Sequence, residues 1–284
     1  MSLFRKNAIN TLSICIEWLL IVSIIYLNVK LDSFFLIGIS IFIIGSRFHA
    51  LGILMHEAAH FNLFTNRQAN DLIGQFFLCS PFLISLQSYR KSHMLHHQYN
   101  LTEKDPTHTR KQGEPVFSFP KKSVTSFFIE LLRIFCGYGI ILNVRDVFRN
   151  AKSIKNEKQS AAKSLLKIIA VLLLVAIVYI THSGFWFLTL WLMPLFTVLP
   201  LLNYWRTVSE HSSLETVEKT RTVIYNLGLQ WFLTPYNVNY HLEHHLFPKK
   251  PWFSLPDVRA QHLDRLEHGQ TTHGIKNLFR EFVS

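Results

Sequence analysis

Four long apolar stretches limit what this chain can fold into. The first runs from Thr11 to Asn28, interrupted only by Glu17, and the second runs from Ser33 to Met55. Two more, Leu165–Ile180 and Phe185–Leu202, follow closely on one another. A helix needs about 20 predominantly apolar residues to cross a bilayer, and helices satisfy their own backbone hydrogen bonds there. The pattern predicts an all-α integral membrane protein with four transmembrane helices.

Short connectors are expected to pair these helices into two hairpins. Val29–Asp32 joins the first two stretches and Thr181–Gly184 the last two, and together they hold one of the 29 lysines and arginines, Lys30. Because basic residues concentrate on the cytoplasmic side, we expect both termini and the intervening polar segments there. The chain is then a single domain, 1–284, with spans at about 11–28, 34–54, 165–181 and 185–202 and a cytoplasmic helical cap formed by 55–163 and 204–284.

Two further apolar segments differ from the spans. Asp71–Leu86 is short and contains a glycine and a proline, so we expect a re-entrant or interfacial segment. Phe127–Val144 carries Glu130 and Arg133 about one turn apart, which favours an amphipathic helix at the membrane interface. The net charge of +11 is not accompanied by a nucleic-acid-binding motif, so we expect no nucleic-acid partner.

Three tight histidine clusters stand in the polar parts of the chain. Positions i, i+3 and i+4 share a helix face, so we expect the imidazoles of each cluster to point to one place. Neutral imidazole is the commonest protein ligand for transition metals, and all three clusters are expected at the same membrane face. The sequence therefore predicts a metal site built from His56-Glu-Ala-Ala-His60, His93-Met-Leu-His96-His97 and His241-Leu-Glu-His244-His245.

The number of histidines favours two ions. Eight imidazoles exceed the four ligands of a tetrahedral zinc site. Six-coordinate ions with open positions use about four or five protein ligands each, although imidazole suits iron, copper, zinc and nickel alike. His211, directly after the last span, is a ninth candidate ligand, and His49, seven residues before His56, is a tenth. We expect no metal role for the isolated histidines, which are His108, His182, His262, His268 and His273.

One rival hypothesis uses the first cluster alone. His56-Glu57-x-x-His60 matches the H-E-x-x-H motif, in which two histidines hold zinc and the glutamate activates water. The chain would then be a membrane metalloprotease. A protease has no use for the other two clusters, so this hypothesis explains less of the sequence.

The three clusters resemble the histidine boxes of membrane fatty acid desaturases and their hydroxylase and ketolase relatives. The order of the clusters, their internal spacing and the long gap before the third agree over roughly Arg47 to Pro256. The resemblance implies a di-iron centre that uses O2 to oxidise an aliphatic C–H bond of a lipid acyl chain, with His211 as an additional ligand. Desaturation is the leading expectation. Hydroxylation or ketolation is the alternative, since Pro251–Pro256 is similar to a ketolase segment.

Neighbouring groups suggest how such a centre is supported. Ligating histidines are usually oriented by a second hydrogen-bonded group. Candidates for this role are Glu57, Asp105, Glu210, Asn239 and Glu243. The chain contains no His-Pro-Gly-Gly heme-binding segment, so we expect a separate electron donor such as ferredoxin or cytochrome b5. A basic face could steer an acidic donor, and its residues would be Lys121, Lys122, Arg145, Arg149, Lys152 and Lys155.

Overall fold

The computed structural model is mostly helical over the residues that it describes. Three helical stretches near the expected spans are long and apolar enough to cross a membrane: Phe4–Leu31, Phe34–Ala59 and Gly184–His211. The expected third span, 165–181, lies outside the described residues apart from 175–176 and 178–181. The described residues are 3–142, 144–145, 175–176, 178–212, 214, 219–262, 266 and 270–283.

The long helices extend past the expected span boundaries. α1 (Leu3–Leu31) and α2 (Phe34–Ala59) meet at a tight turn, where the Ser33 hydroxyl caps α2. A helix of 26 residues is about 39 Å long, whereas the bilayer core is about 30 Å thick. The extra length of the helices places histidines just beyond the apolar stretches, since His56 and His211 lie in the last turns of their helices. The final stretch consists of α9 (Gly184–Phe187), a π-helical segment (Leu188–Leu192), α10 (Met193–Phe196) and α11 (Val198–His211).

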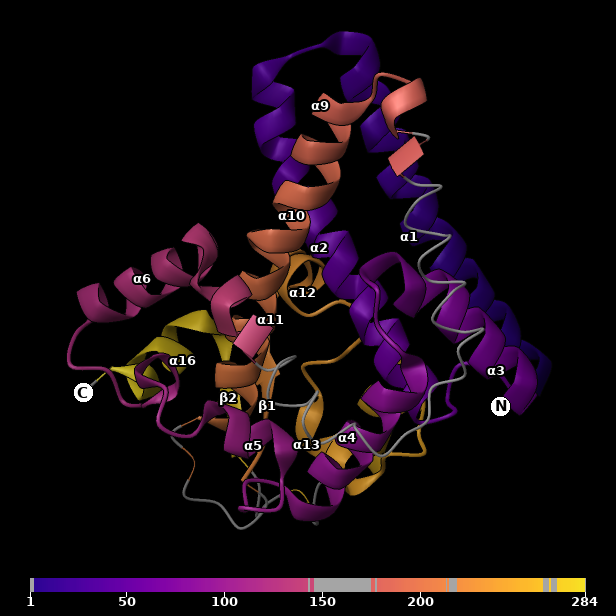
Figure 1. Cartoon of the computed structure of the whole chain (residues 1–284). Coiled ribbons are helices and arrows are strands. Elements are labelled where there is room, and N and C mark those ends of the chain that lie inside the picture. The colour runs from indigo at the N-terminus through magenta and orange to yellow at the C-terminus, as the bar shows by residue number, and fades with distance from the viewer. Residues whose placement is uncertain are drawn as a thin grey trace.

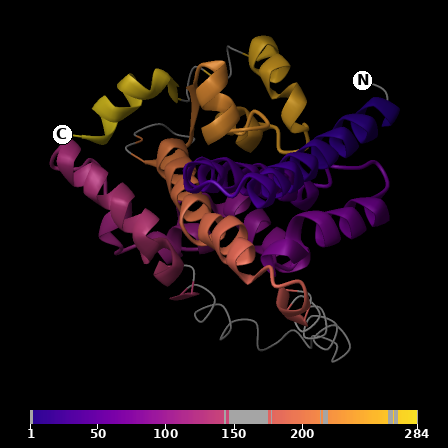
Figure 2. The same ribbon diagram turned by 90° about the horizontal axis from the view of Figure 1, so that it is seen from above.

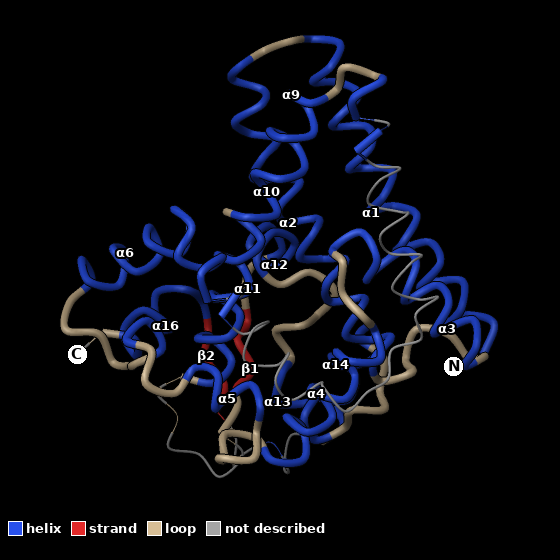
Figure 3. Tube along the Cα trace, in the orientation of Figure 1, coloured by secondary structure: helices blue, strands red, loops and turns tan. Residues whose placement is uncertain are grey.

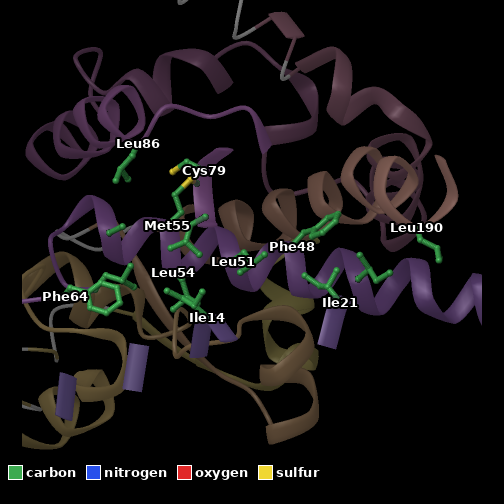
Figure 4. Packing of buried hydrophobic residues seen from close by; sticks show 14 of the residues in the cluster. Ile14, Ile21, Phe48, Leu51, Leu54, Met55, Phe64, Cys79, Leu86 and Leu190 are labelled. Atoms are coloured by element: carbon green, nitrogen blue, oxygen red, sulfur yellow. The ribbon is translucent and has the colours of Figure 1, made fainter. Parts of the chain in front are cut away.

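α2 is the central helix of this arrangement. It packs against α1, α10 and α11, and Figure 1 shows it inside the column that these helices form. A glycine permits the closest approach, because a Cβ atom on Gly45 would lie 2.4 Å from Val198 Cβ of α11. Figure 4 shows the apolar core along α2, where Phe48 and Leu51 are completely buried. The column is therefore a tightly packed frame for the helix ends that carry histidines.

Two other apolar segments have distinct shapes. The stretches 67–82 and 86–99 meet at a bend of 94°, which is the geometry of a re-entrant or broken segment. The first contains α3 (Arg67–Ile73), a π-helical turn (Gly74–Cys79) and a 3-10 turn (Ser80–Phe82), and the second is α4 (Leu86–Tyr99).

The helix that we expected at the interface is also long and apolar enough to cross a membrane. This stretch, Val124–Leu142, is the fourth such stretch among the described residues. Figure 1 shows α6 lying across the direction of α9–α11. The apolar side chains of Phe128, Ile129 and Leu132 on this helix are exposed. That direction fits a helix along a membrane surface. The stretch consists of α6 (Val124–Arg133), a π-helical segment (Ile134–Tyr138) and the residues up to Leu142.

The remaining elements gather at one end of the column, where both termini also lie (Figure 1), and Figure 2 shows the two termini on opposite sides of the molecule. β1 (Arg221–Ile224) and β2 (Gln270–His273) form a two-stranded parallel sheet, drawn in red in Figure 3. This sheet departs from the all-α expectation. The helices here are α5 (Pro106–Lys111), α12 (Leu227–Leu233), α13 (His241–Leu246), α14 (Leu255–Gln261) and α16 (Gly274–Phe282), with 3-10 turns at Pro115–Phe117 and Trp252–Ser254.

Candidate metal centre

Arg90 fixes α4, which carries the second histidine cluster, against the end of α2. Its guanidinium donates hydrogen bonds of 3.0 Å to the carbonyl oxygens of Ala58 and Ala59. These are among the last carbonyls of α2, which have no partner within the helix. The same guanidinium pairs with Asp71 at 2.5 Å. Because Arg90 precedes His93 by less than one turn, the second cluster is held facing the first.

The third cluster lies on α13, which is anchored through its own acidic residue. Glu243 accepts hydrogen bonds from Arg259, at 2.6 Å, and from the Thr222 hydroxyl. Asn239, just before α13, donates to the Val223 carbonyl at 2.9 Å and is thereby tied to β1. The sequence made Glu243 and Asn239 candidates for orienting metal ligands. In the structure their bonds hold α13 onto β1 and α14, which explains why the strands lie beside the histidines.

Nine histidines converge in two adjacent groups. Within each group, one ring nitrogen of every histidine lies within 4.8 Å of those of the others. The groups adjoin, since the ring centroids of His97 and His245 are 4.3 Å apart. They contain all nine histidines that we predicted as ligands. The first group is His56, His60, His93, His97 and His244, and the second group is His96, His211, His241 and His245.

Each H-x-x-H-H cluster divides between the two groups, so our expectation that its three imidazoles point to one place is wrong. His93 and His97 belong to the first group, whereas His96 belongs to the second. On α13 the assignment is reversed, because His241 and His245 belong to the second group. With 3.6 residues per turn, positions i and i+4 differ by about 40°, while i+3 and i+4 differ by about 100°. The motif therefore lets one short helix contribute to both histidine groups.

The nitrogen separations fit ligands of a common ion. The Nε2 atom of His93 lies 2.8 Å from that of His60 and 3.1 Å from that of His97. His241 Nε2 lies 3.0 Å from the Nε2 atoms of both His211 and His245. Two nitrogens about 2.1 Å from one ion and at right angles around it are about 3.0 Å apart. Both groups thus have the spacing of neighbouring positions in octahedral coordination.

Hydrogen bonding among the rings does not account for this arrangement. An imidazole nitrogen carries either one hydrogen or one lone pair in the ring plane. His93 Nε2 and His241 Nε2 each face two other ring nitrogens, so a single hydrogen cannot serve both contacts. Both nitrogens of His56 are buried with no hydrogen-bond partner. Converging lone pairs of this kind fit a shared cation.

The environment favours the neutral form of the histidines that binds metal. Burial, followed by the neighbouring histidines, holds the pKa of His241 well below its usual range. The same causes lower the pKa of His244 and His245. Neutral imidazole is the form that ligates transition metals. α13 therefore presents three rings that are ready to bind.

Asp105 orients one ligand of the second group. Its carboxylate is completely buried, and Oδ2 lies 2.8 Å from His96 Nδ1. Burial raises the pKa of Asp105, but the bond to His96 and the backbone N–H groups of Leu101 and Thr107 outweigh it and lower the pKa to about 2. The charged carboxylate keeps the hydrogen of His96 on Nδ1, so Nε2 presents its lone pair to the second group.

Two other carboxylates lie beside the groups. Glu57 Oε1 is 3.6 Å from His56 Nδ1, and its other oxygen accepts a hydrogen bond from the Trp252 backbone N–H. Glu210 Oε2 is 3.4 Å from His241 Nε2, and its other oxygen is held by Arg206 Nε at 2.8 Å. Glu210 therefore presents a carboxylate edge to the second group, while Glu57 connects the first cluster to the segment after the third.

His49 belongs to neither group. Its Nδ1 atom lies 3.1 Å from Asn203 Oδ1, and the ring is buried. His108, His182, His262 and His273 are also outside both groups, and His268 is outside the described residues.

The basic face that we expected is only partly at the surface. Lys121 is buried and donates to the carbonyls of Pro115 and Val116. Arg145 pairs with Glu114, and Lys122 is exposed. Arg149, Lys152 and Lys155 lie outside the described residues.

A large, mostly apolar cavity adjoins both groups. Its volume is about 1790 Å3, and its lining includes residues of α2, α4 and α9–α11. Lining residues include Phe48, Trp191 and Leu195, together with the ligand candidates His93 and His211. The cavity could hold an extended apolar molecule against the histidines.

Sequence reasoning missed the residues that connect the clusters. Arg90 and Arg259 are isolated arginines in polar segments, where their sequence context does not distinguish them from solvated charges. The pairing of Arg206 with Glu210 could have been predicted, because the two residues are four positions apart and share a helix face.

Comparison with known proteins agrees with this geometry. Residues 33–275 match the model of the family described as fatty acid desaturase. A dihydrorhizobitoxine desaturase from Bradyrhizobium elkanii is 27% identical over 235 residues, which cover 78% of this chain and 66% of that protein. The family match includes all nine grouped histidines and most of the cavity. The chain belongs to the fatty acid desaturase family.

Proposed function

We propose that the two histidine groups hold two iron ions and that the protein is an O2-dependent desaturase. The observation that carries the proposal is the pair of adjacent groups, each with nitrogen separations of about 3 Å, beside an apolar cavity. Five histidines would hold one ion and four the other. Bound iron would supply the oxidising power for an aliphatic C–H bond, which no amino-acid side chain provides.

The chain's own residues would position the substrate and the ligands. Phe48, Trp191 and Leu195 would hold an acyl segment in an extended form and exclude water from it. Asp105 would keep the lone pair of His96 directed at the second ion, and Arg90 would keep α4 facing the end of α2. Family membership supports an oxidoreductase of the desaturase type.

A lipid acyl chain is the proposed substrate, because the cavity is large, apolar and set between helices that are long enough to cross a membrane. The similar Bradyrhizobium protein is a dihydrorhizobitoxine desaturase, which supports desaturation over hydroxylation or ketolation, the alternative outcome. The metalloprotease hypothesis is less well supported, because Glu57 accepts a hydrogen bond from the Trp252 backbone N–H and because His56 and His60 share their group with three more histidines.

We further propose that the metal centre and both termini lie on the cytoplasmic side. Lysine and arginine distribution supports this orientation. Electrons would come from a separate protein of the ferredoxin or cytochrome b5 class. Of the two neighbouring lysines expected on the docking face, Lys122 is exposed and Lys121 is buried, so we propose only Lys122 as a contact for the electron donor.

Lipid profiling by mass spectrometry of a host that expresses the protein tests the reaction. Desaturation removes two hydrogen atoms from a host lipid, whereas hydroxylation adds one oxygen atom. The product should disappear in the His97→Ala variant and persist in His273→Ala, which replaces an exposed histidine outside both groups. Product formation by membrane-inserted His97→Ala would refute the assignment of the site.

A further inference from the structure

The end of the cavity next to the histidines carries a guanidinium that is only partly used. Arg206 of α11 lines the cavity, and its side chain keeps 16% of its surface accessible. Its Nε atom donates to Glu210 at 2.8 Å, and among the described residues the two Nη atoms have no hydrogen-bond partner. Both Nη atoms also retain accessible surface, so this edge of the guanidinium is open to the cavity.

The surroundings of Arg206 leave one positive charge in excess. Among the described residues that line the cavity, those charged at neutral pH are Lys111, Arg206 and Glu210. Lys111 of α5 donates to the Thr207 hydroxyl at 3.3 Å, which places it at the same end of the cavity as Arg206. Two cations and one carboxylate leave a net charge of +1 there, to which bound metal ions would add.

This charged end of the cavity adjoins the second histidine group. Glu210 accepts the hydrogen bond of Arg206 through Oε1, and its Oε2 atom lies 3.4 Å from His241 Nε2. A single carboxylate therefore separates the guanidinium from a ligand candidate. His96 and His211 of the same group also line the cavity. A molecule held by Arg206 would thus lie beside the metal centre.

The chemistry of the guanidinium defines its partner. An arginine side chain has five N–H donors, no acceptor and a permanent positive charge, so its open edge favours an anionic acceptor. Two parallel N–H groups match the two oxygens of a carboxylate or of a phosphate. A phosphate monoester carries nearly two negative charges at neutral pH, whereas a carboxylate carries one. The single positive charge in excess therefore matches a carboxylate.

We propose that Arg206 binds the carboxylate of the substrate, supported by the charge of Lys111, and that the apolar chain of the substrate extends from there along the cavity. The inference rests on the proposed function and deepens it, because it makes the substrate a free carboxylic acid with an apolar chain. The charged end of the substrate then lies beside the metal centre, so the C–H bonds within reach are those near the carboxylate. Arg206 thereby selects the substrate class and the region that is oxidised.

Binding of three matched probes to the full-length protein in detergent tests the subsite. Dodecanoic acid, dodecanamide and dodecyl phosphate share one apolar chain. The measurement is the dissociation constant from ligand-dependent shifts in thermal unfolding at about pH 8, where the acid is charged. The wild type should bind the acid roughly ten- to a hundredfold more tightly than the amide, as hydrogen bonds to a charged group allow. Equal binding of acid and amide, or tighter binding of the phosphate than of the acid, would overturn the proposal.

Three variants assign the preference to the guanidinium. Arg206→Gln should remove the preference for the acid, and Arg206→Lys, which keeps the charge but not the paired N–H groups, should keep part of it. Arg133→Gln is the matched control, because it removes an arginine from another Arg–Glu pair, which is exposed and outside the cavity, and it should leave the preference unchanged. Samples of equal metal content are compared, so that direct binding of the acid to a metal ion is constant. A full preference in Arg206→Gln would overturn the proposal.

The subsite and the proposed reaction fail separately. The binding measurement needs no turnover, so the preference for the acid would persist if the protein carried out no oxidation. In the lipid profile of an expressing host, the new double bond should lie near the carboxyl end of a free acid. A double bond in the middle of the chain would refute the subsite and leave the proposed desaturation standing.

Discussion

Asp105 offers a sharp test of how the second ion is held. Its Oδ2 atom lies 2.8 Å from His96 Nδ1, and its Oδ1 atom accepts a 2.7 Å hydrogen bond from the Thr107 N–H as the N-cap of α5. Asp105→Asn removes the charge that orients His96 but keeps a good capping residue. Removing a partner of a ligating histidine costs about 10- to 100-fold in metal affinity, which corresponds to roughly 1.4–2.7 kcal/mol.

The loss should be confined to one of two ions. Chelator competition on the purified protein, with the metal counted at each chelator concentration, should show one ion released 10- to 100-fold more easily and the other unchanged. Asp105→Ala is the comparison, because it also removes the cap and should lower the unfolding free energy by about a further 1 kcal/mol. The reasoning is refuted if Asp105→Asn binds both ions like the wild type, or weakens both equally.

Three other predictions address neighbouring ligands, a buried ion pair and pH. His244→Ala should weaken the ion of the first group, and His245→Ala, although it alters the adjacent residue, should weaken the ion of the second group. Identical spectroscopic signatures of the remaining ion in the two variants would contradict the division. Arg47 and Glu17 form a buried ion pair at 3.2 Å, so Arg47→Met or Glu17→Gln alone should lower the stability by about 3–5 kcal/mol in a thermal unfolding assay. The double replacement Glu17→Leu with Arg47→Met should recover most of the lost stability. The pKa values of the three α13 histidines lie below the unfolded value of about 6.5, so the unfolded chain takes up protons first as the pH falls. Thermal stability and metal retention should therefore be full above about pH 6.5 and decline below it. A thermal unfolding midpoint that stays constant down to about pH 5 would contradict the burial argument.

Much of the metal centre could be inferred from the sequence because ligand spacing within a helix is local. The i, i+4 pairs His56/His60, His93/His97 and His241/His245 each remain together in one group. The division of His96 and His244 from their neighbours depends on the directions from which α4 and α13 approach α2. Those directions are set by Arg90 and Glu243 through contacts between distant segments, which spacing does not encode.

The fold, too, could be predicted from the sequence only in part. Apolar runs predicted three long helices correctly, but their ends were placed too early, because polar residues such as His56 continue a helix beyond its apolar run. The β1–β2 pair consists of two four-residue strands far apart in the sequence, and each is too short to produce a recognisable alternation. β1 also binds the segment that carries the third cluster, through Thr222 and Val223.

The metal content of the purified protein, measured with the Mössbauer spectrum of iron-57-labelled samples, tests the central claim most directly. Two groups of histidines, five and four in number, predict close to two irons per chain, in two environments that the spectrum distinguishes. One metal ion per chain, or zinc in place of iron, would contradict the account.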